Sequence, residues 1–225
     1  MTCEIKIITV ENFLGKVNCY LLKKDTGFIL IDTGWSNKRA YLEKELEKLG
    51  CSPDNLKLII LTHGDFDHSG NSAYLSREFN AKIAMHSDDS GMIEQGDMFW
   101  NRKKANVLIR IAIKALSGIS GLKPEKFKPD LNLDEGNDLS EYGFDAKVLH
   151  VPGHSKGSIG ILTDEGNFFC GDLLENLNKP APGSIIDDPE EFNSSIEKLG
   201  GLKIKTVYPG HGKPFPMELL IIKNR

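Results

Sequence analysis

The sequence lacks the features that mark disulfide scaffolds, membrane proteins and polyanion binders. Its four cysteines form no C-x-x-C pair, which excludes a zinc ribbon and gives no obvious disulfide framework. No apolar run is long enough to cross a bilayer, and the first residues lack a basic start followed by an apolar stretch. We therefore expect a soluble protein of the reducing cytoplasm.

Charge and composition indicate which classes of partner to expect. A formal net charge of -4 gives no general attraction to nucleic acid or to an anionic membrane. We therefore expect a small-molecule substrate, with neither nucleic acid nor membrane as a partner. The 225 residues, of which 40% are hydrophobic and 27% charged, suffice for a sizeable core. A single domain over residues 1–225 is the simplest expectation.

Apolar runs alternate with helical patterns in the first and last thirds of the chain. Strands are predicted at residues 5–10, 17–22, 28–31, 58–61, 81–85, 147–151, 159–162, 168–170 and 206–208. Leucines at helical spacing predict a helix that Ser36 caps and Gly50 ends, and a second helix is predicted over 69–79. Asp188, followed by proline and two glutamates, predicts the start of a third. In the first third of the chain, Asp32 follows one strand and His63 follows a later one. Asp172 and His211 have the same placement in the last third. This repeated pattern indicates two β-rich halves with helices outside.

The chemically richest segment runs from His63 to His68 and reads His-Gly-Asp-Phe-Asp-His directly after an apolar run. Seven imidazole and carboxylate side chains have similar placements near strand ends and glycines: His63, Asp65, Asp67, His68, His154, Asp172 and His211. Such groups suit zinc, iron or manganese. Seven are more than one tetrahedral site uses, so two ions are expected, with Asp172 as the best candidate bridge. A polar loop explains any one of these residues alone, but not their number.

The order of these motifs resembles the metallo-beta-lactamase superfamily over nearly the whole chain. The resemblance is carried by Asp32, the His63–His68 segment, Pro152-Gly153-His154, Gly171-Asp172 and Gly210-His211. Each motif alone is weak, whereas together they are specific. The resemblance implies an α/β fold, a four-layer αββα sandwich of two sheets flanked by helices, with a binuclear site at one edge.

The resemblance also implies an assignment of the ligands. The first metal would be held by His63, Asp65 and His154, and the second by Asp67, His68 and His211. Asp172 would bridge the two ions. Asp32 would orient ligands without binding metal itself.

Asp65 departs from the family pattern, because most members have histidine there. A carboxylate makes the first site harder, so zinc is our preferred ion while iron and manganese remain alternatives. Diiron flavoproteins of the superfamily share the carboxylate but add a flavodoxin domain, which we do not expect in this protein. We therefore expect hydrolysis of a small ester, thioester, lactone or phosphodiester by a metal-bridging hydroxide, with Asp67 orienting it or relaying a proton. The alternatives are an iron-dependent oxidoreductase acting on oxygen, nitric oxide or persulfides, and a metal-binding scaffold without turnover.

The middle of the chain is expected to hold a helical insertion at about residues 87–130. Its most apolar part, residues 107–116, must be buried against another surface. The alternatives are that it forms a lid over the metal edge, a homodimer contact, or plain packing against the core. No motif needs His86 or His150, so we expect both to be ordinary structural histidines. Cys170 is expected to be a small buried residue.

Overall fold

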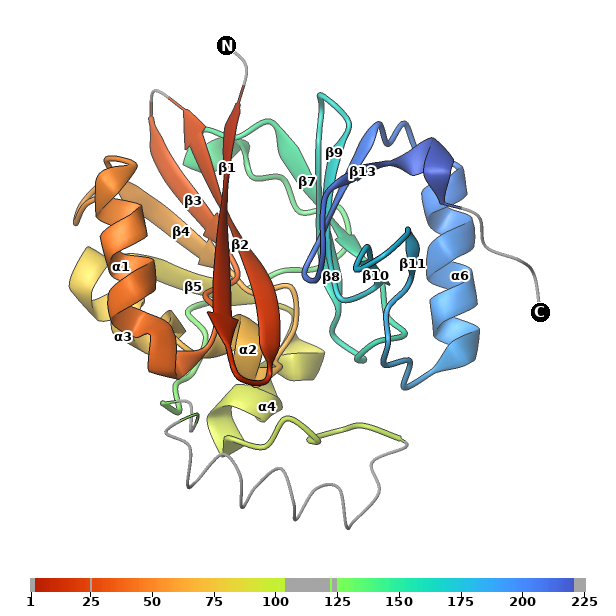
Figure 1. Ribbon diagram of the computed structural model, residues 1–225, viewed down its shortest axis with the longest axis horizontal. Helices are drawn as coiled ribbons and strands as arrows, with labels where there is room; N and C mark the ends of the chain where they lie inside the picture. Colours follow the sequence, from red (N-terminus) through yellow and green to blue (C-terminus); the bar gives the residue numbers. More distant parts are fainter. Residues whose placement is uncertain (1–2, 25, 104–121, 123–124, 221–225) are drawn as a thin grey trace.

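Two β-sheets lie face to face, with helices on their outer faces (Figure 1). The computed structural model describes residues 3–24, 26–103, 122 and 125–220. The first sheet contains, in spatial order, β1 (Glu4–Asn12), β2 (Gly15–Lys24), β3 (Gly27–Ile31), β4 (Leu56–Ile60), β5 (Lys82–Met85) and β6 (Leu131–Asn132). The second contains β13 (Phe215–Pro216), β12 (Thr206–Pro209), β9 (Asn167–Gly171), β8 (Ile159–Thr163) and β7 (Ala146–His150). The strands β10 (Leu174–Glu175) and β11 (Ala181–Pro182) form a separate pair.

Parallel strands in each sheet determine where the loops gather. From β3 to β6 the neighbours of the first sheet are parallel, and β9 and β12 are parallel in the second. Parallel neighbours end at the same sheet edge, so the segments that follow β3, β4, β9 and β12 begin there. The predicted pairing of 159–162 with 168–170 is confirmed, with Ile161 opposite Phe169.

The alternation of side chains along each strand builds three apolar layers. In β3 and β4, Ile29 and Leu58 face the second sheet and join Ile161 and Phe169, while Leu30 faces the helices. The outer face of the first sheet is covered by α1 (Arg39–Lys48) and α3 (Ser72–Phe79). The outer face of the second is covered by α6 (Pro189–Gly200). This is the predicted αββα sandwich.

Two details of the helix predictions need correction. Ser36 does not cap α1, because it begins the short 3-10 helix η1 (Ser36–Lys38), and Lys38 precedes α1 without a side-chain cap. The helix expected over 69–79 is divided into α2 (Phe66–Ser69) and α3. The start of α6 is confirmed, since the Asp188 carboxylate accepts the backbone N–H groups of Glu190 and Glu191.

Hydrogen bonds between the sheets join β2 to the end of β12. The Tyr20 hydroxyl donates to the carbonyl of Pro209 at 2.5 Å. The Asn18 side-chain amide donates to the carbonyls of Pro209 and Gly212, at 3.1 and 2.7 Å, and its backbone N–H donates to Gly210. These bonds fix the edge of one sheet against the loop that follows β12, which carries His211.

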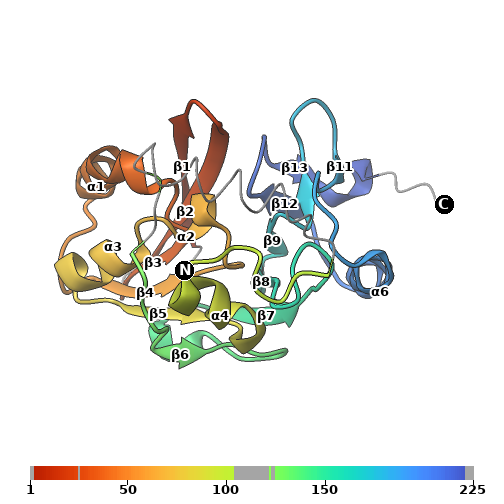
Figure 2. The ribbon, with the colours of Figure 1, turned by 90° about the horizontal axis from the view of Figure 1, so that it is seen from below.

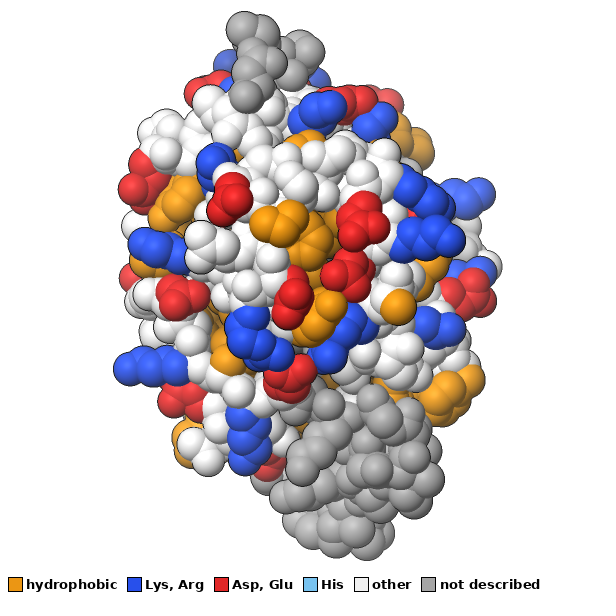
Figure 3. All heavy atoms as spheres, turned by 90° about the vertical axis from the view of Figure 1, so that its left-hand side faces the viewer, with side chains coloured by type: hydrophobic (Ala, Val, Ile, Leu, Met, Phe, Trp, Pro, Cys, Tyr) orange, Lys and Arg blue, Asp and Glu red, His pale blue; other side chains and the backbone are white. Residues whose placement is uncertain are grey.

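Figure 2 views the molecule from the end where α2 and α4 (Ser87–Gln95) lie, with α1 and α3 on one side and α6 on the other. On the face that bears α1 and α3, acidic and basic side chains are interspersed, and neither sign forms one continuous patch among the described residues drawn (Figure 3). Within the described ranges, no helix combines the length and apolar character that a membrane span requires.

Candidate metal centre

All seven predicted ligand residues lie together at one edge of the two sheets. His63 follows β4, and Asp65, Asp67 and His68 lie on the loop that leads into α2 or within that helix. The other three come from the second sheet: His154 from the loop between β7 and β8, Asp172 directly after β9, and His211 after β12. The arrangement follows from the parallel strands, whose ends meet at this edge.

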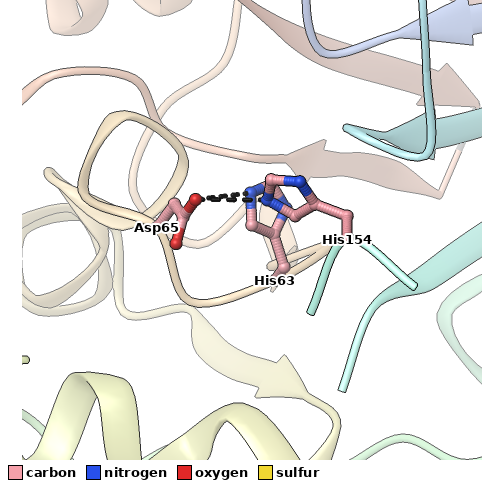
Figure 4. Close-up of side chains that lie close together, drawn as sticks. All are labelled: His63, Asp65 and His154. Atoms are coloured by element: carbon pink, nitrogen blue, oxygen red, sulfur yellow. Dashed lines mark hydrogen bonds and ion pairs between the residues drawn. The ribbon is translucent and has the colours of Figure 1, made fainter. Parts of the chain in front are cut away.

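We define His63, Asp65 and His154 as the first group. Asp65 Oδ2 lies 3.2 Å from His154 Nε2 and 3.7 Å from His63 Nε2. Figure 4 shows the two rings and the carboxylate directed toward one another. One potential ligand atom from each residue lies within 4.8 Å of the others. The three side chains can therefore contact one cation.

We define Asp67, His68 and His211 as the second group, whose potential ligand atoms also lie within 4.8 Å of one another. Asp67 Oδ2 lies 3.3 Å from His211 Nε2 and 3.7 Å from His68 Nε2. Asp172 lies between the groups: its Oδ1 is 3.2 Å from His68 Nε2, its Oδ2 is 3.3 Å from His211 Nε2, and it also clusters with His63. This is the position that a bridging carboxylate needs.

In each of the four histidines, one ring nitrogen is engaged by the protein and the other is left for a metal. Nδ1 contacts an acceptor in all four: Thr62 Oγ1 for His63, Asp32 Oδ2 for His68, the Ile185 carbonyl for His154 and the Lys16 carbonyl for His211. Each Nε2 is therefore directed at the carboxylates. Among the described residues, His63 Nε2 is buried without a hydrogen-bond partner, while the buried His68 Nε2 and Asp172 Oδ1 form an ion pair with each other at 3.2 Å. Buried polar atoms rarely remain unpaired, so these residues fit a pair of divalent cations.

Asp32 connects two of the imidazoles. Its carboxylate accepts the Thr62 N–H, the Thr62 hydroxyl and the His68 Nδ1–H, each at 2.8 Å. The Thr62 hydroxyl gives its proton to Asp32 and so accepts from His63 Nδ1 at 3.0 Å. Such an outer carboxylate fixes ring orientation and raises ligand basicity, in keeping with the role that the resemblance implies for Asp32.

Two glycines allow the backbone to approach the ligands. Gly171 has a φ of +51°, and a Cβ there would lie 2.5 Å from Thr62 Oγ1. At Gly210 a Cβ would lie 2.4 Å from Asp172 Oδ1 and 2.6 Å from His68 Cε1. A larger residue at position 210 would push Asp172 and His68 apart, and one at position 171 would displace Thr62, the hydrogen-bond partner of His63 Nδ1.

The two groups differ in exposure and charge. The first group is buried, whereas the side chains of His211, Asp67 and Asp172 are 21%, 16% and 15% exposed. Solvent therefore reaches the centre through the second group. Burial opposes ionisation of Asp172, but His68 and His211 hold its pKa well below its usual range. Burial disfavours the charged form of His211, yet Asp172 raises its pKa to about 10. A metal ion here would displace protons.

The structure places two further charged residues at the centre that the sequence patterns did not indicate. Asp89 of α4 is fully buried and accepts hydrogen bonds from Gly64 N, Ser155 Oγ and Gly157 N, so it joins the loops that carry His63 and His154. Arg102 is ion-paired with Asp65. In the sequence, Asp89 resembles any acid in a first helical turn, and Arg102 belongs to a basic run that ordinarily faces solvent.

The remaining predictions concern residues outside the ligand set. His86 and His150 stack with ring centroids 4.2 Å apart, and although they form a further group with Asp88, both His86 nitrogens already face partners, Asp88 N and Asp134 Oδ1. They agree with the structural interpretation. Cys170 is buried, as expected, and burial raises its pKa. The predicted helix 107–116 lies outside the described residues.

Comparison with known proteins gives a consistent result. The profile of the Metallo-beta-lactamase superfamily matches residues 13–211. A probable metallo-hydrolase of Methanocaldococcus jannaschii is 28% identical over 92% of this chain and 93% of its own. The hydroxyacylglutathione hydrolase GloC of Haemophilus influenzae is 30% identical over 76% of this chain and 72% of its own. The crystal structure of TTHA1623 in a di-iron-bound form matches with a TM-score of 0.73 and 29% identity, over 95% of this chain and 96% of that one.

Proposed function

The chain belongs to the metallo-beta-lactamase superfamily of metallo-hydrolases, and we propose that it uses two divalent cations to hydrolyse a small ester, thioester, lactone or phosphodiester. The observation that carries the proposal is the convergence of four Nε2 atoms and three carboxylates at one sheet edge, where the buried His63 Nε2 has no hydrogen-bond partner among the described residues. A purely structural polar cluster would be expected to pair that atom with a neighbouring side chain or with the backbone.

The residues of the two groups and Asp172 would hold the cations, and Asp67 would also act on the attacking water. Two divalent cations bound here would lower the pKa of water toward neutrality and polarise the scissile carbonyl or phosphoryl group. The first group would hold one cation and the second group would hold the other, while Asp172 would contact both. Asp67, whose side chain is partly exposed and lies 3.3 Å from His211 Nε2, is placed to orient a nucleophilic water or accept its proton.

The surroundings of the centre favour a substrate with an apolar part. Ile185, whose carbonyl accepts a hydrogen bond from His154 Nδ1, is 51% exposed. Leu177 is 61% exposed and follows Asn176, which hydrogen-bonds to the His211 carbonyl. The named activity of the 30% identical relative makes a thioester the first substrate class to test. The net charge of -4 supports a small molecule over a nucleic acid or membrane partner.

A second function, iron-dependent oxidoreduction, is favoured by one observation. Asp65 places a carboxylate in the first group, and the similar TTHA1623 was crystallised with two irons. Carboxylate oxygen is a harder ligand than imidazole and suits iron or manganese. Hydrolysis remains our proposal, with zinc as the preferred ion.

The test combines metal analysis with substrate panels. Protein purified without chelator would be analysed for metal and assayed on esters, thioesters, lactones and phosphodiesters. We expect hydrolysis in at least one panel that a chelator abolishes and added metal restores. His211→Ala should abolish it, whereas the control His150→Ala, which removes a histidine outside the centre, should retain it. Bound iron with oxygen consumption and no hydrolysis would replace our proposal with the oxidoreductase.

A further inference from the structure

Arg102 occupies an unusual position for a cation, because it lies against the residues of a candidate cation site. Its Nη2 donates to Asp65 Oδ1 at 2.7 Å and lies 3.2 Å from His154 Nε2. Its side chain is only 4% exposed. Among the described residues, it is the one lysine or arginine that forms an ion pair with any of the seven candidate ligands.

The two oxygens of Asp65 have different partners. Oδ1 accepts the Arg102 hydrogen bond, while Oδ2 faces His154 Nε2 and His63 Nε2. Asp65 can therefore contact Arg102 and a cation at the same time, through separate oxygens. His154 cannot do so, because its Nδ1 is bonded to the Ile185 carbonyl and only Nε2 is left. A cation at the first group would displace Arg102 from His154 but not from Asp65.

The charges explain why such a pair is useful. Asp65 is buried, and the Arg102 guanidinium is its ion-pair partner. A buried carboxylate without a partner would be costly, and a buried guanidinium beside a divalent cation would repel it. Together the two side chains contribute no net charge to the first group.

We infer that Arg102 is a positioning residue for the first metal: it holds Asp65 with Oδ2 directed at the cation and balances the charge that this carboxylate adds. The inference rests on the proposed metal-dependent function. It follows that Asp65 and Arg102 act as one unit. Loss of one member alone changes metal binding, and loss of both restores the charge of the site.

A double-mutant cycle tests this inference without relying on activity. Asp65→His alone leaves Arg102 facing three imidazoles with its charge unbalanced, and we expect first-site affinity to fall at least about tenfold because the guanidinium repels the cation. Arg102→Met alone leaves the buried Asp65 carboxylate without the partner that fixes it, so first-site affinity should also fall, by about 10–100-fold. The double variant Asp65→His with Arg102→Met should recover at least about tenfold of the affinity that Asp65→His loses.

Metal equivalents after dialysis, competition with a chromophoric chelator, and the visible spectrum of the cobalt-substituted protein give the readouts. Lys103→Met is the matched control: it removes a positive charge one residue away, from a side chain that is 72% exposed and ion-paired with Asp188, and should change nothing. Arg102→Lys keeps the charge and should retain both metals. Thermal melting of the metal-free variants separates misfolding from altered binding.

Two results would overturn the inference. One is an Asp65→His variant that binds both metals as tightly as the wild type. The other is a folded double variant that binds no better than Asp65→His. Wild-type protein that binds two metals but hydrolyses nothing would contradict the proposed function alone, and the cycle would still decide the role of Arg102.

Discussion

Replacement of Asp32 by asparagine should weaken metal binding at the second group while leaving the fold in place. The substitution keeps the size of the side chain, and asparagine tolerates the positive φ of 60° that position 32 adopts. It removes the charge and one acceptor. The carboxylate accepts three hydrogen bonds, from Thr62 N, Thr62 Oγ1 and His68 Nδ1. An amide has one oxygen, so in either orientation its NH2 group faces at least one of these donors.

The expected size of the effect follows from these contacts. A buried donor left without its acceptor costs about 1–3 kcal/mol of stability. In a protein of this size, each kcal/mol lowers the melting temperature by about 2–4 °C. His68 also loses the negative partner that fixes Nδ1 as its protonated nitrogen, and loss of such outer-shell contacts weakens metal binding about 10–100-fold.

Metal affinity would be measured by competition with a chromophoric chelator, and stability by thermal melting of the metal-free protein. Asp54→Asn is the matched control, since Asp54 also has a positive φ, of 75°, but is exposed and distant in the fold from the ligands. An Asp32→Asn protein that binds both metals with wild-type affinity would refute the reasoning that Asp32 orients His68.

Three further outcomes are expected. Asp172→Ala should reduce bound metal from about two equivalents toward one or none, because this carboxylate faces both groups; elemental analysis that finds the same content in the variant would contradict the bridge. Chelation of the metal should lower the melting temperature, because a ligand present at 100 times its Kd stabilises the folded state by about 2.7 kcal/mol; identical melting curves would argue against tight binding. In the native protein a thiol reagent at pH 8 should leave Cys19, Cys51 and Cys170 unmodified, since burial raises their pKa, that of Cys51 to about 12. Cys3 is partly exposed, with a pKa raised mainly by burial to about 11, and should react slowly; rapid modification of a buried thiol would contradict this assignment.

The sequence predicted the architecture because strand patterns and ligand motifs are local. The runs around Ile29, Leu58 and Ile161 alternate or are wholly apolar, as buried strands require, and each motif follows such a run. Since strand ends gather at one edge, the seven candidate ligands could be expected to meet. The Ser36 cap was wrong because serine caps and serines in preceding turns look alike in sequence.

The charged residues around the ligands could not be predicted for a different reason. Arg102 and Asp89 act through contacts with residues 37 and 25 positions or more away, and nothing in their local sequence distinguishes them from solvent-facing charges. Their burial depends on how α4 and the segment after it lie against the loops of both sheets. Such a placement is a property of the assembled structure and not of any local pattern.

The bonds from Tyr20 and Asn18 to the segment 209–212 have a consequence for how the enzyme tolerates change. Neither half of the molecule carries all the ligands of the first group or of the second. The residues from His63 to His68 come from one half, whereas His154, Asp172 and His211 come from the other. Any substitution that lets the halves slide, even at a side chain far from the ions, alters the separation of the donors. The packing between the two sheets therefore determines both the stability of the fold and the geometry of the metal centre, so a substitution in this packing affects both.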